Sequence, residues 1–139
     1  MIPAIRKAYN ESFSKETYAA FLKDLDSVHP GALEFRVAET PVFVPWDFKN
    51  KTLDACESII GIIADPGFKE LTKNAIPKGL RVPGENDHSH FIAFDFGICV
   101  NDAGEYEPQL IEMQGFPTLF AYEILLDDLF RNHFPVPEN

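Results

Sequence analysis

The sequence predicts an α+β fold, in which a small antiparallel or mixed sheet packs on flanking helices. Apolar residues recur at helical spacing over residues 14–31, 48–65 and 118–134. Residues 91–114 instead form two apolar runs around a polar turn, which is typical of a hairpin with strands at about 91–100 and 108–114. We interpret residues 1–139 as a single domain, since this length suffices for a core. The linker-like ending FPVPEN leads us to expect the N-terminal portion of a longer protein.

The first predicted helix begins after Ser14, a residue type that caps helix N-termini, and ends at Pro30-Gly31. Its apolar face consists of residues at i, i+3, i+4 and i+7, namely Tyr18, Phe21, Leu22 and Leu25. The next segment, 32–45, alternates apolar and charged residues. We therefore expect one or two strands from residues 33–44 to extend the sheet.

Three further segments lead to the C-terminal helix. Residues 48–65 have helical spacing, with one face made of Leu53, Cys56, Ile60 and Ile63. Residues 65–77 begin with Asp65 at the N-cap and Pro66 at the first helical position. Residues 78–90 are rich in Gly, Pro and Asn and are predicted as a loop. The helix over 118–134 carries the apolar residues Phe120, Ile124, Leu125, Leu126 and Phe130.

Charge and composition exclude several classes of function. The formal net charge is −10 with no run of Lys or Arg, which argues against non-specific binding to nucleic acid or to anionic membrane surfaces. The sequence has no transmembrane-length apolar run and no secretory signal at its start. Cys56 and Cys99 lie in apolar sequence without CxxC spacing. We therefore expect reduced core cysteines in a cytoplasmic protein.

Two carboxylates interrupt the apolar runs of the predicted hairpin, Asp95 in one strand and Glu112 in the other. A tight turn centred on Ala103-Gly104 sets a register in which these two residues are cross-strand neighbours. Side chains alternate faces along a strand, so Gln114 shares the face of Leu110 and Glu112. The opposite face gathers apolar residues as a core: Phe94, Phe96, Ile98, Ile111 and Met113.

Like charges directly opposed on a strand pair repel each other. A divalent cation between Asp95 and Glu112 would reverse this, and Mg²⁺ prefers one or two carboxylates with waters and substrate phosphates. The spacing therefore indicates a metal site. The alternative is a structural pair at a solvated sheet edge, with one carboxylate protonated or salt-bridged.

The hairpin and the residues after it resemble the circularly permuted ATP-grasp ligases, in particular the glutathionylspermidine-synthase-like group. The resemblance rests on Asp95-Phe96 and on LIEMQGFPTLFAYE (110–123). That family carries Asp-Phe on one strand, a hydrophobic-hydrophobic-Glu-x-Asn run on the next, and a Thr-Pro-rich turn into a helix. By this resemblance Asp95, Glu112 and Gln114 would ligate Mg²⁺ beside the phosphates of ATP. Gln114 stands where the family has Asn, and Ala93 stands where it usually has Arg.

The resemblance implies an ATP-dependent carbon–nitrogen ligase, which phosphorylates a carboxylate and lets an amine displace the phosphate. The lysines, Gly-rich loop and adenine pocket of that fold have no match in these residues. We therefore expect this domain to supply metal ligands without being catalytically competent alone. A C-terminal domain would complete the site for ATP and a small-molecule substrate. The alternative is a non-catalytic ligand-binding or protein-interaction domain, and the oligomeric state stays open.

Two other candidates lie outside the hairpin. Arg36 is a candidate for binding an anionic substrate, because guanidinium matches carboxylate and phosphate geometry. Its alternatives are exposure to solvent or pairing with Glu39. His88 and His90 have an HxH spacing that suits zinc together with Asp87 or Glu85. The alternative there is a polar loop with two solvated histidines.

Overall fold

The computed structural model describes residues 2–86, 88–117 and 119–137. It confirms the α+β class, since helices are combined with a two-stranded antiparallel sheet in the C-terminal half. Contacts divide the chain into two compact units, Met1–Pro45 with Thr118–Asn139, and Trp46–Pro117. The single-domain interpretation stays a prediction. None of the described helices has the length and apolar character needed to cross a membrane.

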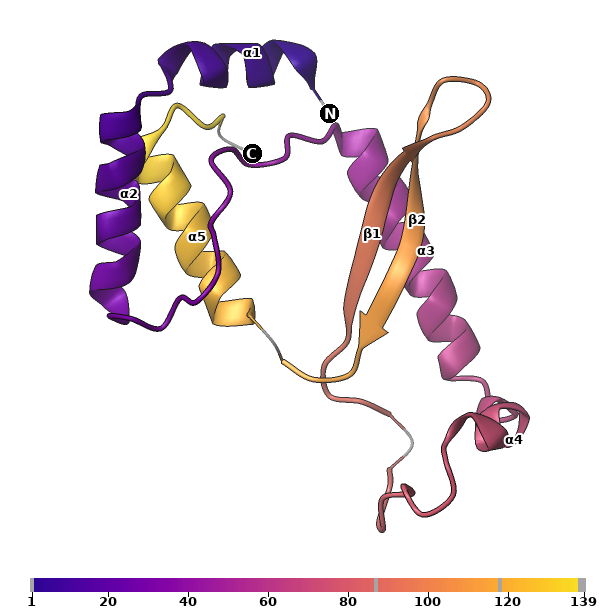
Figure 1. Cartoon of the computed structure of the whole chain (residues 1–139). Coiled ribbons are helices and arrows are strands. Elements are labelled where there is room, and N and C mark those ends of the chain that lie inside the picture. Colours follow the sequence, from indigo (N-terminus) through magenta and orange to yellow (C-terminus); the bar gives the residue numbers. More distant parts are fainter. Residues whose placement is uncertain (1, 87, 118, 138–139) are drawn as a thin grey trace. The chain divides into compact units, whose positions relative to one another are not determined.

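The first unit contains α1 (Pro3–Ser12), α2 (Lys15–Val28) and α5 (Phe120–His133), and α2 lies alongside α5 (Figure 1). Helix α2 is the predicted one, because the Ser14 hydroxyl accepts a hydrogen bond from the Thr17 amide at 3.1 Å. Its predicted apolar face is confirmed by the burial of Phe21 and Leu25. Helix α1 adds to the predicted elements and contributes the buried Tyr9.

The core of this unit is mainly aromatic. Among the described residues, seven buried side chains form it, namely Tyr9, Phe21, Leu25, Phe43, Leu129, Phe130 and Phe134. The ring centroids of Phe21 and Phe130 lie 4.7 Å apart, and those of Tyr9 and Phe134 lie 5.1 Å apart. In α5 the buried positions are Leu129 and Phe130, whereas Ile124 is 68% exposed. The core therefore contacts the C-terminal part of α5 most closely.

Residues 32–45 form no strand, so the expected extension of the sheet by residues 33–44 is wrong. Carbonyl groups of this segment accept hydrogen bonds from side chains and, at Phe43, from the backbone amide of Ile2, rather than from a neighbouring strand. The Tyr18 hydroxyl donates to the Val37 carbonyl at 2.6 Å, and the Tyr9 hydroxyl donates to the Glu39 carbonyl at 2.9 Å. Pro41 lacks the N–H group that a central strand needs. The segment is thus fixed by tertiary contacts.

The Tyr9 hydroxyl makes the stability of the protein dependent on alkaline pH. Burial, and secondarily Tyr18, raise the pKa of Tyr9 from 10.0 to about 12. As the pH rises, the Tyr9 hydroxyl therefore loses its proton in the unfolded chain at a lower pH than in the folded protein. The stabilisation that Tyr9 contributes is fully present below pH 10 and is lost as the pH rises through about 12.

We expect Tyr9→Phe to lower the free energy of unfolding at neutral pH by about 1 to 2 kcal/mol, because the Glu39 carbonyl loses its donor. The variant should also lose stability less steeply than the wild type between pH 10 and 12. Denaturant unfolding over this range measures both effects. Parallel pH curves for the two proteins would contradict the argument.

The second unit contains α3 (Trp46–Ile63), α4 (Phe68–Thr72), the short 3₁₀ helix η1 (Lys73–Ala75) and a hairpin of β1 (Ala93–Val100) and β2 (Tyr106–Gln114). Helix α3 packs against β2 (Figure 1). The rings of Phe48 and Tyr106 meet edge to face there, with centroids 6.3 Å apart. Strand β2 begins two residues earlier than expected, at Tyr106 rather than 108.

Two helix predictions in this unit need correction. Leu53 and Ile60, expected on the covered face of α3, are 50% and 41% exposed, and Ile59 is better covered than Ile60. The helix expected over 65–77 is replaced by a turn, α4 and η1. Asp65 is not the expected N-cap, because the N-cap of α4 is Gly67 and makes no side-chain capping bond. The Asp65 Oδ1 instead accepts a hydrogen bond from the Gly67 amide at 2.7 Å, which stabilises the turn before α4.

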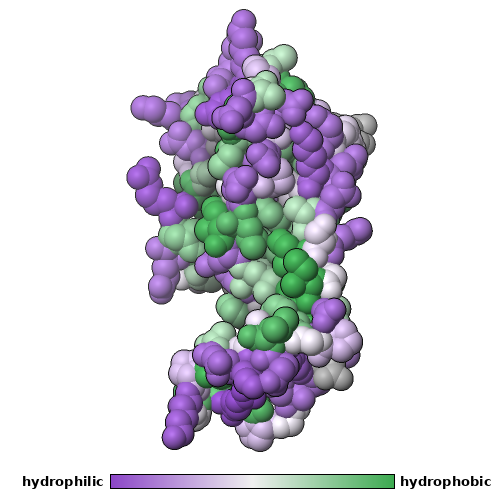
Figure 2. Space-filling view, turned by 90° about the vertical axis from the view of Figure 1, so that its right-hand side faces the viewer, coloured by the Kyte–Doolittle hydropathy of each residue, from purple (hydrophilic) through white to green (hydrophobic). Residues whose placement is uncertain are grey.

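The second unit leaves much apolar surface uncovered. On the hairpin, Ile98, Val100, Leu110 and Met113 are 40 to 62% exposed. Figure 2, which views the molecule from the right-hand side of Figure 1, shows hydrophobic patches between polar regions. Both cysteines are free, as expected, but Cys99 is exposed and is not a core residue.

Candidate functional site

The candidate metal site depends on the register of the hairpin, which is set first by its turn. The turn has three residues rather than the two expected at Ala103-Gly104, since the Asn101 amide donates to the Glu105 carbonyl at 2.9 Å. The Asn101 Oδ1 accepts from the amides of Ala103 and Glu105, which fixes the turn. Gly104 has a φ of 81°, in the left-handed region that favours glycine. Next to the turn, each β1 residue therefore pairs with a β2 residue one position earlier than expected.

A β-bulge at Ile111 restores that register. Phe96 pairs with Leu110 and Asp95 pairs with Glu112, so Ile111 is an extra residue in β2. The predicted pairing of Asp95 with Glu112 is thus confirmed, although it results from two offsetting departures from a regular hairpin.

The bulge changes which face some β2 residues occupy. Opposed residues of an antiparallel pair share a face, so the register places Leu110 with Met113 on the apolar face and not with Glu112. Ile111, expected beside Met113, lies near Gly97 on the other face. Its Cδ1 is 3.8 Å from the position that a Cβ on Gly97 would take. The expected faces of Leu110 and Ile111 are therefore wrong, whereas that of Glu112 is right.

The three predicted metal ligands lie on one face of the hairpin, because Asp95 is opposite Glu112 and Ala93 is opposite Gln114. Asp95 and Glu112 are exposed, so neither is a buried charge. The Gln114 Nε2 donates to the Glu112 Oε1 at 2.6 Å. This bond fixes the orientation of the amide, since a carboxylate accepts hydrogen bonds and does not donate them.

The Gln114 amide leaves one oxygen without a partner. Its Oε1 is buried and accepts no hydrogen bond in the described part of the chain. A buried acceptor without a donor costs about 1 to 3 kcal/mol, so a cation or a water molecule at this position would be stabilising. The unpaired oxygen belongs to the same residue that the family resemblance assigns to the metal.

The donor set fits a hard cation. Two carboxylates and an amide oxygen are all oxygen ligands, which Mg²⁺ takes in preference to nitrogen or sulfur. The described residues contain no group of three or more His, Cys, Asp or Glu side chains that could hold a metal ion. The candidate site therefore offers few protein ligands, as is usual for Mg²⁺ that keeps waters and binds phosphates.

Arg36 lies in the first unit, whereas the carboxylate pair lies in the second. Its side chain is exposed and lines a cavity of about 400 Å³ together with Tyr18 and Glu39. Burial and then Glu39 raise the pKa of Tyr18, while Arg36 lowers it. Within the described ranges Arg36 forms no ion pair with Glu39. Arg36 thus borders a cavity, and its role in binding an anion stays a prediction.

Among the described residues, His88 and His90 form no group with Glu85 that could hold zinc. The rings of His88 and His90 lie 5.8 Å apart, edge to face. Glu85 forms an ion pair with Lys69 at 3.4 Å. Asp87, the other expected ligand, lies outside the described residues.

The sequence-based predictions missed one group of side chains. Lys69, Lys73 and Arg81 line a single cavity in the second unit. A signal was present, because residues 69–81 hold four of the 12 basic residues of an acidic chain.

Comparison of the chain with protein-family models, with curated proteins and with solved structures finds no match.

Proposed function

We propose that this chain contributes Mg²⁺ ligands to an ATP-grasp-like carbon–nitrogen ligase and is not catalytically competent alone. The observation that carries the proposal is the register of the hairpin, which brings Asp95, Glu112 and the unpaired oxygen of Gln114 to one face. These are the residues to which the sequence resemblance assigns the metal. The partners implied are ATP and small-molecule substrates, namely an acid and an amine.

Each of the three residues would have its own part in this function. Asp95 and Glu112 supply the negative charge that attracts the cation, and Gln114 supplies a neutral oxygen. The Gln114 Nε2 also orients the Glu112 carboxylate through its hydrogen bond to Oε1. A Mg²⁺ ion held by these residues would supply positive charge that offsets the charge of the phosphates. Since Ala93 cannot assist the transferred phosphate, a cationic group would come from another part of the protein.

Thermal unfolding with and without Mg²⁺ tests the metal site. We expect Mg²⁺ to raise the Tm of the wild type, because a ligand at ten times its Kd stabilises the folded state by about 1.4 kcal/mol. The double variant Asp95→Asn, Glu112→Gln should not respond. Without metal it should be more stable than the wild type by about 0.2 to 1 kcal/mol, since the opposed charges are gone.

Glu107→Gln is the matched control, because Glu107 is exposed and lies on the same face, opposite Cys99. It should keep the Mg²⁺ response. Equal responses of the double variant and the wild type, at matched ionic strength, would exclude the site. Release of phosphate from ATP by the wild-type chain would instead contradict only the statement that it is not competent alone.

The exposed apolar face of the hairpin favours a second candidate, a non-catalytic protein-interaction domain. Val100 and Leu110 are 62% and 47% exposed on the face opposite the carboxylates. Large uncovered apolar patches on a soluble protein mark interaction surfaces. This function requires no metal, so a Tm that does not change with Mg²⁺ would favour it.

A further inference from the structure

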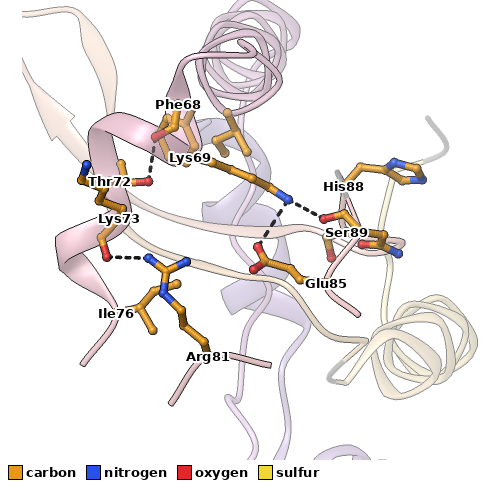
Figure 3. A pocket seen from close by; sticks show the side chains of 11 residues that line it. Phe68, Lys69, Thr72, Lys73, Ile76, Arg81, Glu85, His88 and Ser89 are labelled. Atoms are coloured by element: carbon orange, nitrogen blue, oxygen red, sulfur yellow. Dashed lines mark hydrogen bonds and ion pairs between the residues drawn. The ribbon is translucent and has the colours of Figure 1, made fainter. Parts of the chain in front are cut away.

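A cavity of about 400 Å³ lies in the second unit beside α4, η1 and the loop that follows Leu80 (Figure 3). This volume falls within the range of about 300 to 1,000 Å³ that is typical of small-molecule sites. Most of its lining consists of an apolar part and a basic part. The apolar part is formed by Ile63, Phe68 and Ile76, and the basic part by Lys69, Lys73 and Arg81.

Two cations reach across this cavity from opposite segments (Figure 3). Lys69 extends from α4 to the loop, where its ammonium group donates to the Asn86 carbonyl at 2.6 Å and pairs with Glu85 at 3.4 Å. Arg81 extends from the loop towards η1, and its Nη2 donates to the Lys73 carbonyl at 3.2 Å. The loop and the helical segment are thus joined through the same groups that give the cavity its charge.

The cavity is positive in an acidic protein. Among the described residues, three cations and one carboxylate, Glu85, line it, while the whole chain has a net charge of −10. Lys69 pairs with Glu85 and Lys73 pairs with Glu70 outside the lining, so Arg81 supplies the positive charge that is not balanced. Arg81 has no acidic partner among the described residues, and only one of its five N–H donors is used. A guanidinium group with free donors matches the geometry of a phosphate or carboxylate.

We propose that this cavity binds a phosphate ester with an apolar or aromatic body. Arg81 and Lys69 would hold the phosphate, and Phe68 and Ile76 would contact the body. The proposal draws on no residue of the hairpin metal site, so it does not depend on the ligase function. A purely structural role for Lys69 and Arg81, as links between the loop and the helical segment, makes different predictions.

Calorimetric titration with three probes tests the specificity of the cavity: phenyl phosphate, inorganic phosphate and phenol, at constant ionic strength. Phenyl phosphate should bind more tightly than inorganic phosphate, because it also contacts the apolar wall, and phenol should bind most weakly. No saturable binding of phenyl phosphate, or equal binding of phenol, would overturn the proposal. Equal binding of inorganic phosphate would overturn the part assigned to Phe68 and Ile76.

Variants separate an anion site from a structural link. Arg81→Gln should weaken phenyl phosphate binding at least about tenfold, since hydrogen bonds between charged groups are lost. Lys78→Gln also removes one positive charge from this segment, at an exposed position outside the lining. It should change the affinity for phenyl phosphate less than about twofold. Glu85→Gln should tighten binding about two- to fivefold, because Glu85 competes with the anion for Lys69.

The sign of the Glu85→Gln effect decides between the two roles. If Lys69 and Arg81 are only structural links, Glu85→Gln should loosen the loop and weaken phenyl phosphate binding, as Arg81→Gln does. Weaker binding by Glu85→Gln would therefore overturn the proposal. Circular dichroism checks that each variant is folded. If Arg81→Gln does not fold, Arg81→Lys replaces it, and this change should still weaken binding because the planar fork is lost.

Discussion

Replacing Phe21 by Ala lowers the free energy of unfolding of the first unit by about 3 to 5 kcal/mol. Phe21 is 0% exposed, and its ring lies 4.7 Å from that of Phe130 and 5.8 Å from that of Phe134, measured between centroids. The change leaves a cavity where α2 meets α5. Since whole domains are stable by only about 5 to 15 kcal/mol, we expect this unit to be largely unfolded under mild denaturing conditions.

Denaturant unfolding followed by circular dichroism measures this loss, and hydrogen exchange assigns it to α2 and α5. Phe35→Ala is the matched control, because it removes the same ring from a position that is 50% exposed in the same unit. We expect it to cost about 1 kcal/mol or less. Equal losses for the two variants would mean that the aromatic core does not hold the unit together.

Replacing Phe48 by Ala has the second-largest expected effect, a loss of about 3 kcal/mol in the second unit. Phe48 is 6% exposed and is the buried hydrophobic residue that the structure describes in this unit. Its ring meets Tyr106 where α3 packs on β2. With few other buried contacts, the unit has little to compensate for the change.

Hydrogen exchange of the β1 and β2 amides is the measurement, and we expect protection to fall in both strands. Trp46→Ala, two residues earlier and at a site that is 62% exposed, is the control and should leave protection unchanged. Because the carboxylate pair needs a folded hairpin, Phe48→Ala should also abolish the Tm response to Mg²⁺ without altering a ligand. Unchanged strand protection in Phe48→Ala would contradict the packing argument.

The elements that the sequence predicted well are those specified by local signals. The Ser14 cap and the helical spacing up to Leu25 lie within one segment, and α2 follows them closely. Residues 33–44 show the opposite case. Their alternation is typical of a strand, but hydrogen bonds from Tyr9 and Tyr18, which are 30 and 19 residues away from their acceptors, give the segment another conformation. Such distant contacts leave no local pattern.

The candidate site was predicted in part. The pairing of Asp95 with Glu112 followed from strand alternation and an approximate turn position, and it is confirmed. The bulge was not predictable, because Ile111 is apolar like Leu110 before it and nothing marks it as the extra residue. The basic cavity was missed because Lys69 and Arg81 come from different segments, which the loop brings together.

The bulge also determines where β2 can vary in length. All eight cross-strand pairs are formed without Ile111, so a chain that lacks this residue would keep every partner and gain a regular strand. Ile111 is 71% exposed, and its deletion would uncover little apolar surface. Deletion of Met113 would differ, because it would turn Gln114 to the opposite face from Glu112. Single-residue insertions and deletions that preserve the carboxylate pair and its amide neighbour are therefore expected at the bulge and not between Glu112 and Gln114.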